Sequence, residues 1–170
     1  MMTVIIGGSG SGKSAFAEAL VRKLKGERIY LATMAAGDPE SLRRIARHRK
    51  QREHLGFATV EQPLRLFDAV IPAGANVLLE DLSNLLANEM FAPAGGGVDA
   101  VRRGLDPLIT FCGNLTVVTN EVFSGGTEYA EETLAYMRNL AALNRELAGR
   151  ADLVIEVLCG LPNVLKGELP

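Results

Sequence analysis

The sequence lacks several features that mark specialised classes of protein. It contains no tryptophan, aromatic residues make up 5% of the chain, and the formal net charge at pH 7 is −2. A nucleic-acid-binding module needs a basic surface and often aromatic side chains for base stacking, so this composition argues against that class. No apolar run approaches the roughly 18–20 residues that a membrane-spanning helix requires, and we expect no membrane span.

Cysteine is also scarce. Cys112 and Cys159 lie in apolar stretches and lack the spacing of metal ligands, which predicts two buried, reduced thiols rather than a disulfide framework. The first residues, MMTVIIGG, carry no basic segment and too short an apolar run for a signal peptide. We therefore expect a cytoplasmic protein.

The length of 170 residues predicts one domain, residues 1–170. Short apolar segments alternate with amphipathic ones. Strands are predicted at 3–6, 28–33, 57–61, 76–80, 115–120 and 153–158, with an antiparallel edge strand at 162–165. Helices are predicted at 14–25, 38–54, 63–70, 82–91, 98–111 and 129–148, and the glycine-rich segment 92–98 is predicted to be a mobile loop. This order indicates an α/β fold, a mainly parallel sheet with helices on both faces.

A glycine-rich loop follows the first predicted strand. Residues 7–14 read GGSGSGKS and match G-x-x-x-x-G-K-[ST], a pattern whose backbone N–H groups wrap a polyphosphate at the start of a helix. Lys13 is placed to reach the β- and γ-phosphates, and Ser14 to ligate Mg²⁺. The candidate phosphate-binding residues are Gly7, Gly8, Ser9, Gly10, Ser11, Gly12, Lys13 and Ser14. The fold is therefore predicted to be P-loop NTPase-like, of the RecA-like kind.

A second acidic ligand for Mg²⁺ is expected at the end of another strand. Glu80 and Asp81 end the run NVLLED, and both are candidates. The guanine-reading motif N-K-x-D is absent, and residues 119–121 resemble it only superficially. The sequence therefore does not indicate a signalling GTPase, and the choice between ATP and GTP stays open.

The predicted helix at 38–54 contains a basic segment, RRIARHRKQR at residues 43–52. Arg44, His48 and Arg52 are spaced i, i+4, i+8 and form one stripe on that helix. Neighbouring cations favour the neutral, nucleophilic imidazole and also bind phosphate oxygens. His48 could therefore attack a phosphorus atom and form a covalent phosphoramidate, although a solvated basic face or a general anion patch explains the same pattern.

Motifs along almost the whole chain resemble one known family, the bifunctional adenosylcobinamide kinase/adenosylcobinamide-phosphate guanylyltransferases of cobalamin nucleotide-loop assembly. The resemblance adds to the P-loop six further motifs. They are YLAT at 30–33, R-I-x-x-H-R-x-x-R at 44–52, T-V-E-x-P-L at 59–64, LLED-L-S-x-x-x-x-N at 78–88, V-T-N-E-V at 118–122 and A-D-L-V-I-E-V-x-C-G-L-P at 151–162.

This resemblance implies a function in two steps. ATP or GTP phosphorylates adenosylcobinamide; GTP then guanylylates His48, and GMP passes to adenosylcobinamide phosphate, giving adenosyl-GDP-cobinamide and pyrophosphate. It implies His48 and Lys13 as catalytic residues, Ser14 and Glu80 as Mg²⁺ ligands, and a homotrimer. Beyond the P-loop, the nucleotide-binding residues that it implies are Ala32, Thr33, Met34, Arg44, Arg49, Lys50, Gln51, Arg52, Glu61 and Glu80.

Two other functions are compatible with parts of the sequence. A P-loop kinase for a small molecule, without the guanylyltransferase step, would use the basic helix only to clamp phosphates. A nucleotide-gated module that binds nucleic acid would use the same helix on RNA or DNA, but the composition disfavours it.

Overall fold

The computed structural model describes residues 1–35, 46, 54–122 and 128–169, so most of the predicted helix at 38–54 lies outside the described residues. The strands are β1 (Met2–Gly7), β2 (Arg28–Ala32), β3 (Ala58–Glu61), β4 (Asn76–Glu80), β5 (Asn114–Asn120), β6 (Leu153–Leu158) and β7 (Leu161–Lys166). The helices are α1 (Lys13–Arg22), α3 (Leu82–Phe91), α4 (Gly97–Phe111) and α5 (Glu131–Arg150), with a 3-10 turn, η1 (Leu66–Asp68).

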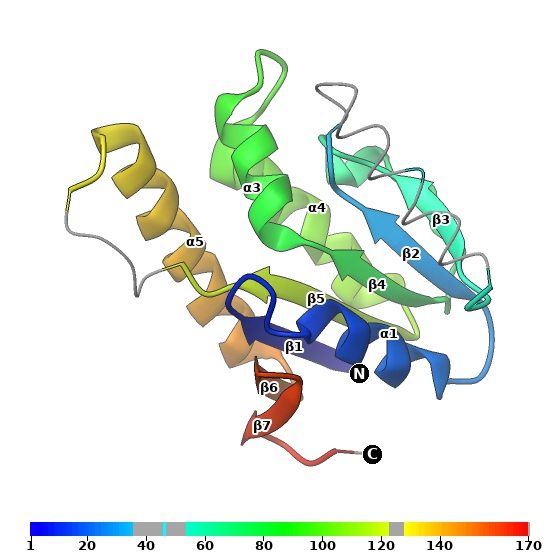
Figure 1. Cartoon of the computed structure of the whole chain (residues 1–170). Helices are drawn as coiled ribbons and strands as arrows, with labels where there is room; N and C mark the ends of the chain where they lie inside the picture. Colours follow the sequence, from blue (N-terminus) through cyan, green and yellow to red (C-terminus); the bar gives the residue numbers. More distant parts are fainter. Residues whose placement is uncertain (36–45, 47–53, 123–127, 170) are drawn as a thin grey trace.

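The described strands form one sheet in the order β3-β2-β4-β5-β1-β6-β7 (Figure 1). Every neighbouring pair is parallel except β6 and β7, which run antiparallel. The predicted mainly parallel sheet and its antiparallel C-terminal edge strand are therefore confirmed. Parallel strands end at the same edge of a sheet, so loops that follow β1, β2, β4 and β5 meet there.

Helices cover both faces of the sheet, as predicted. Successive residues of a strand point to opposite faces, and on β1 Val4 packs in one buried cluster and Ile5 in another. The Ile5 cluster includes Val21 of α1, whereas the Val4 cluster includes Leu85 of α3 and Leu143 of α5. Because both faces are covered, the central strands are apolar at successive positions, without alternation.

The segment predicted as a helix at 63–70 forms only η1. Arg65, just before it, has a left-handed backbone with φ of 52°, and its N–H donates to the carboxylate of Glu89 at 2.5 Å. Glu89 is 1% exposed and also accepts a hydrogen bond from the N–H of Gly96. A tertiary contact with one buried carboxylate therefore overrides the local helical pattern and fixes the glycine-rich turn before α4.

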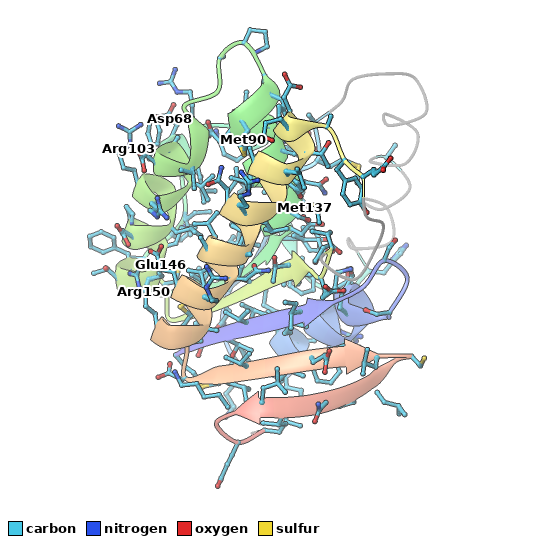
Figure 2. All side chains as sticks on the ribbon, turned by 90° about the vertical axis from the view of Figure 1, so that its left-hand side faces the viewer. Asp68, Met90, Arg103, Met137, Glu146 and Arg150 are labelled. Carbon is cyan, nitrogen blue, oxygen red and sulfur yellow. The ribbon has the colours of Figure 1, made fainter. Side chains whose placement is uncertain are left out.

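The contact between η1 and α4 depends on a glycine. A Cβ atom built on Gly104 would lie 2.5 Å from the Cβ of Leu66, whereas one built on Gly149 of α5 meets nothing within 4 Å. On the outer surface, Glu146 and Arg150 of α5 (Figure 2) pair with Arg102 and Asp106 of α4 at 3.0 and 2.8 Å. Surface ion pairs contribute little, so the two helices are held mainly by their buried side chains, which pack in the same cluster against the sheet.

The prediction of two buried thiols was wrong for Cys159. Cys112 is half-buried, but Cys159 is exposed and lies in the turn between β6 and β7 with φ of 50°. The apolar strand ends one residue before it, and the chain reverses direction there. Within the described ranges, no helix is both long and apolar enough to cross a membrane.

Candidate active site

The glycine-rich loop joins the end of β1 to the start of α1. Gly10 and Gly12 have φ of 72° and 90°, a region that favours glycine. A Cβ atom on Gly7 would lie 2.6 Å from the carbonyl oxygen of Val157, so the loop also needs glycine for space. Lys13 is buried, and its Nζ donates across the loop to the carbonyl oxygen of Gly8 at 3.2 Å. The loop thus has the shape that a phosphate cradle requires.

Ser14 and Glu80, both predicted as Mg²⁺ ligands, are brought together from residues far apart in the sequence. The Ser14 hydroxyl donates to Oε1 of Glu80 at 2.6 Å. The other carboxylate oxygen, Oε2, is buried and has no hydrogen-bond partner in the described part of the chain. Hydroxyl and carboxylate oxygens suit Mg²⁺, so the pair fits the ion.

The environment of Glu80 perturbs its ionisation. Burial raises the pKa of Glu80 from 4.5 to about 7, and the neighbouring Asp81 adds to this effect, whereas the hydrogen bond from Ser14 and the charge of Lys13 oppose it. A carboxylate with a raised pKa beside a phosphate cradle is a common feature of functional sites. A bound cation would favour the ionised form, because it supplies the missing partner for Oε2.

Both carboxylate oxygens of Asp81, the alternative acidic ligand, already accept hydrogen bonds from the protein. Its Oδ1 accepts hydrogen bonds from the Ser83 hydroxyl at 2.5 Å and from the N–H of Asn84 at 2.7 Å. Its Oδ2 accepts from the side-chain amides of Asn84 and Asn120 at 3.2 and 3.5 Å. Asp81 therefore caps α3 at its N-terminus, and the geometry favours Glu80 as the free ligand.

The other predicted nucleotide-binding residues that the structure describes lie at the ends of β2 and β3 or directly after β2. Ala32 is in register with both Glu61 and Glu80, so three strand ends lie in a row. Thr33 is fully buried, and its Oγ1 accepts a hydrogen bond from the N–H of Asp81 at 2.8 Å. Met34 is half-buried and Glu61 exposed. The Thr33 side chain thus ties β2 to the end of β4.

Sequence reasoning missed Asn88, which organises the same edge. Its side-chain amide donates to the carbonyl oxygen of Thr33 at 2.8 Å and to that of Pro63 at 2.9 Å. One residue of α3 thereby fixes the segments that leave β2 and β3. The motif LLED-L-S-x-x-x-x-N contains Asn88 at its last position, but nothing in the sequence identifies its partners.

The basic stripe is not among the described residues. All the predicted site residues of the basic segment lie in the range 36–53, of which the structure describes only residue 46. These residues are Arg44, His48, Arg49, Lys50, Gln51 and Arg52. Their roles stay predictions.

The glycine-rich cradle between β1 and α1, together with the Ser14–Glu80 pair at the edge of a parallel sheet, defines a P-loop nucleotide-binding protein. The model of the family described as cobinamide kinase / cobinamide phosphate guanyltransferase (CobU) matches residues 3–165. The chain belongs to this family.

Named relatives agree with this assignment. The chain is 34% identical to the bifunctional adenosylcobalamin biosynthesis protein CobP of Pseudomonas aeruginosa, with 99% of each chain covered. It is also 34% identical to the bifunctional adenosylcobalamin biosynthesis protein CobU of Escherichia coli, covering 95% of this chain and 97% of that one. Among solved structures, the P4 protein from bacteriophage phi6 in complex with ADP aligns with a TM-score of 0.46 at 18% identity, over 96% of this chain and 52% of that chain.

Proposed function

We propose that this protein phosphorylates adenosylcobinamide and then transfers GMP from GTP to the resulting phosphate. Membership of the cobinamide kinase / cobinamide phosphate guanyltransferase family supports both steps. The observation that carries the kinase step is the Ser14–Glu80 pair beside the glycine-rich loop. It joins phosphate-binding backbone, a buried lysine and a carboxylate at one place, which is the set that phosphoryl transfer needs.

In the kinase step, the loop N–H groups and Lys13 hold the phosphates of ATP or GTP. Ser14 and Glu80 would hold Mg²⁺, an ion that neutralises charge developing on the transferred phosphoryl group when it is bound. The hydroxyl of the aminopropanol arm of adenosylcobinamide attacks the γ-phosphorus. Its oxygen forms the new P–O bond and releases its proton to solvent, the bond between the γ-phosphorus and the β-phosphate oxygen breaks, and the nucleoside diphosphate leaves.

In the guanylyl transfer step, a neutral His48 imidazole attacks the α-phosphorus of GTP. An N–P bond forms and the bond to the β-phosphate oxygen breaks, so pyrophosphate leaves. A phosphate oxygen of adenosylcobinamide phosphate then attacks the same phosphorus and displaces the imidazole. The residues of the basic segment that take part in nucleotide binding are Arg44, Arg49, Lys50, Gln51 and Arg52, and those at the ends of β2 and β3 are Ala32, Thr33, Met34 and Glu61.

The nucleophile assignment is tested by trapping the intermediate. Incubation with GTP labelled at the α-phosphorus should leave label on the protein that is stable to base and labile to acid. His48→Ala should abolish this label and keep the kinase step, whereas His54→Ala, which changes the other histidine of the chain, should leave both unchanged. An adduct that survives His48→Ala would contradict the assignment, and kinase turnover without any adduct in the wild type would indicate a plain kinase.

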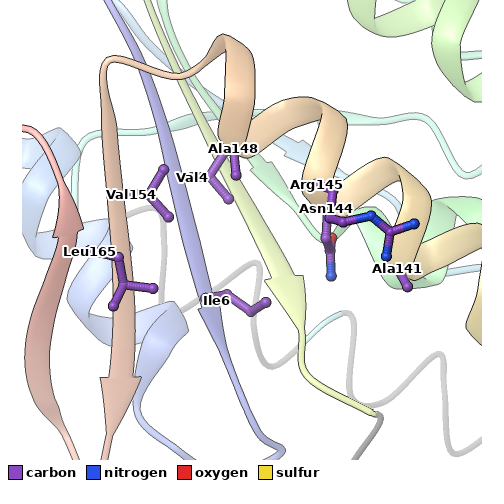
Figure 3. Close-up of a pocket in the computed structure, with 8 residues that line it drawn as sticks. All are labelled: Val4, Ile6, Ala141, Asn144, Arg145, Ala148, Val154 and Leu165. Carbon is purple, nitrogen blue, oxygen red and sulfur yellow. The ribbon is translucent and has the colours of Figure 1, made fainter.

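The protein is further proposed to act as a single domain in the cytoplasm and to assemble as a homotrimer. Two free thiols support a reducing compartment. A groove of about 410 Å³ supports assembly, because it lies between α5 and the sheet and is lined mostly by apolar side chains (Figure 3). The floor of this groove is formed by Val4, Ile6, Val154 and Leu165, and Arg145 lies at its side. Light scattering on the purified protein would test the trimer.

A further inference from the structure

The motif V-T-N-E-V at 118–122 has no role in the function proposed above, yet its asparagine lies beside the phosphate cradle. β5 stands between β1, which leads into the glycine-rich loop, and β4, which ends at Glu80 (Figure 1). Asn120, the last residue of β5, is in register with Gly7, the first residue of the loop. The N–H of Glu121 donates to the carbonyl oxygen of Gly7 at 3.1 Å. The end of β5 is therefore fixed next to the cradle.

The side chain of Asn120 lies on the same face of the sheet as Glu80. Val118, two residues earlier, packs in the buried cluster that includes residues of α1, and residues two apart in a strand share a face. Leu78 packs in the same cluster, which places Glu80 on that face too and allows its hydrogen bond with Ser14 of α1. Asn120 and Glu80 therefore both lie on the α1 side, at the ends of two adjacent strands.

Hydrogen bonds determine which end of the Asn120 amide is free. The Ser83 hydroxyl donates to Oδ1 of Asp81 at 2.5 Å, so its oxygen can only accept, and it accepts a hydrogen bond from Nδ2 of Asn120. Nδ2 also donates to Oδ2 of Asp81 at 3.5 Å. Both N–H groups are thus engaged, whereas Oδ1 receives no hydrogen bond from any residue that the structure describes. This half-buried side chain offers the site an acceptor only.

Helix α5 holds the backbone on both sides of this amide. Asn144 is buried, accepts a hydrogen bond from Oγ1 of Thr119 at 2.8 Å and donates to the carbonyl oxygen of Asn120 at 3.3 Å. The Tyr136 hydroxyl donates to the carbonyl oxygen of Ser83 at 3.2 Å. The amide is therefore fixed before any substrate binds, which is what the positioning of a reacting group requires.

We propose that Asn120 positions the acceptor hydroxyl in the kinase step, through a hydrogen bond from that hydroxyl to Oδ1. This inference rests on the proposed kinase step and deepens it. The hydroxyl oxygen must come within about 3–3.5 Å of the γ-phosphorus, which is held beside Lys13, Ser14 and Glu80. An ionised phosphate has no hydrogen to donate to Oδ1, whereas a hydroxyl has one, so the free end of the amide selects the nucleophile and not the nucleotide.

The hydrogen bond orients the hydroxyl without removing its proton. An amide oxygen is not a base at neutral pH, and the loose transition state of phosphoryl transfer depends on positioning more than on early proton removal. The proton passes to solvent as the new P–O bond forms and the bond between the γ-phosphorus and the β-phosphate oxygen breaks. Ser83 acts through Asn120 and is a positioning residue, because its hydroxyl sets the direction of the amide.

Steady-state kinetics and calorimetric titration test the role of Asn120. Asn120→Ala should lower kcat/KM for adenosylcobinamide about tenfold, the upper end of what one neutral hydrogen bond contributes. It should leave unchanged the affinities, with Mg²⁺, for the nucleoside diphosphate and the β,γ-imido triphosphate of the base that the wild type uses. The matched control is Asn114→Ala, at the opposite end of β5, where Nδ2 donates to Oδ1 of Asn76 at 2.7 Å. This control should lower stability without lowering kcat/KM.

A second variant, Ser83→Ala, leaves Asn120 in place and removes an acceptor of its N–H groups. It should lower kcat/KM for adenosylcobinamide about two- to tenfold and leave both nucleotide affinities unchanged. The double variant Ser83→Ala/Asn120→Ala should be no slower than Asn120→Ala alone, because Ser83 acts only through Asn120. Two independent structural roles would instead give effects that multiply.

The outcomes separate this inference from the function beneath it. If Asn120→Ala loses affinity for the imido triphosphate but not for the diphosphate, Asn120 contacts the γ-phosphate and the assignment is overturned. An unchanged kcat/KM in Asn120→Ala, an equal loss in Asn114→Ala, or multiplied effects in the double variant would also overturn it and leave the kinase step standing. If Asn120→Ala does not fold, Ser83→Ala decides through the same kinetics and affinities. A wild type that binds nucleotide without phosphorylating adenosylcobinamide would contradict the proposed function itself.

Discussion

The substitution Glu80→Gln removes a buried ionisable group with almost no change in shape. In the wild type, burial raises the pKa of Glu80 from 4.5 to about 7, so the folded protein holds a proton that the unfolded chain releases at lower pH. Stability therefore falls as pH rises from about 4.5 to about 7 and is constant above that. The difference between the two pKa values corresponds to a loss of roughly 3 kcal/mol in the free energy of unfolding of the wild type between low and high pH. The variant cannot ionise at this position and therefore does not lose this stability.

The assay is urea unfolding of the ligand-free protein in EDTA at pH 5 and pH 8. Glu80→Gln should be more stable than the wild type by roughly 3 kcal/mol at pH 8 and by less than about 1 kcal/mol at pH 5. Glu131→Gln, a change at an exposed carboxylate on α5, should alter stability within about 0.5 kcal/mol at both values. A stability gain in Glu80→Gln that is the same at both pH values would refute the assigned burial of this carboxylate.

Four further substitutions are expected to separate effects on catalysis from effects on packing. Lys13→Ala should lower kinase kcat at least about a hundredfold, because it removes the cation at the phosphates, as measured by steady-state kinetics. Asn88→Ala should lower the free energy of unfolding by about 1 kcal/mol or more, since the partly buried carbonyl groups of Thr33 and Pro63 lose their donor; unchanged denaturant midpoints would contradict this. Gly104→Ala should cost about 1–3 kcal/mol by overpacking against η1, whereas Gly149→Ala, in open space within α5, should stabilise by up to about 1 kcal/mol. Equal melting temperatures for these two glycine variants would contradict the close packing of Gly104 against η1.

Most of the fold follows from local pattern. Buried parallel strands are short apolar runs, and helices between them are amphipathic, so sequence reasoning located every strand of the described sheet. It failed at 63–70, where a helical pattern yields to the buried carboxylate of Glu89, a partner in a different element. It failed again at Cys159, because an apolar neighbourhood in sequence does not reveal that the strand ends there.

The candidate site was predictable only in part. The glycine-rich loop is a contiguous motif, and its position between a strand and a helix can be read directly from the sequence. The family resemblance already implied Glu80 in preference to Asp81, but the physical reason needs contacts that no local pattern contains, since one of the donors to the Asp81 carboxylate is Asn120 at the end of β5.

β7 ends the sheet with a strand whose six residues are all exposed. Pro162 stands in this strand opposite Val157, and proline has no N–H to offer a further strand. Another chain that approaches this border therefore meets an interrupted row of backbone donors, which discourages open-ended growth of the sheet from molecule to molecule.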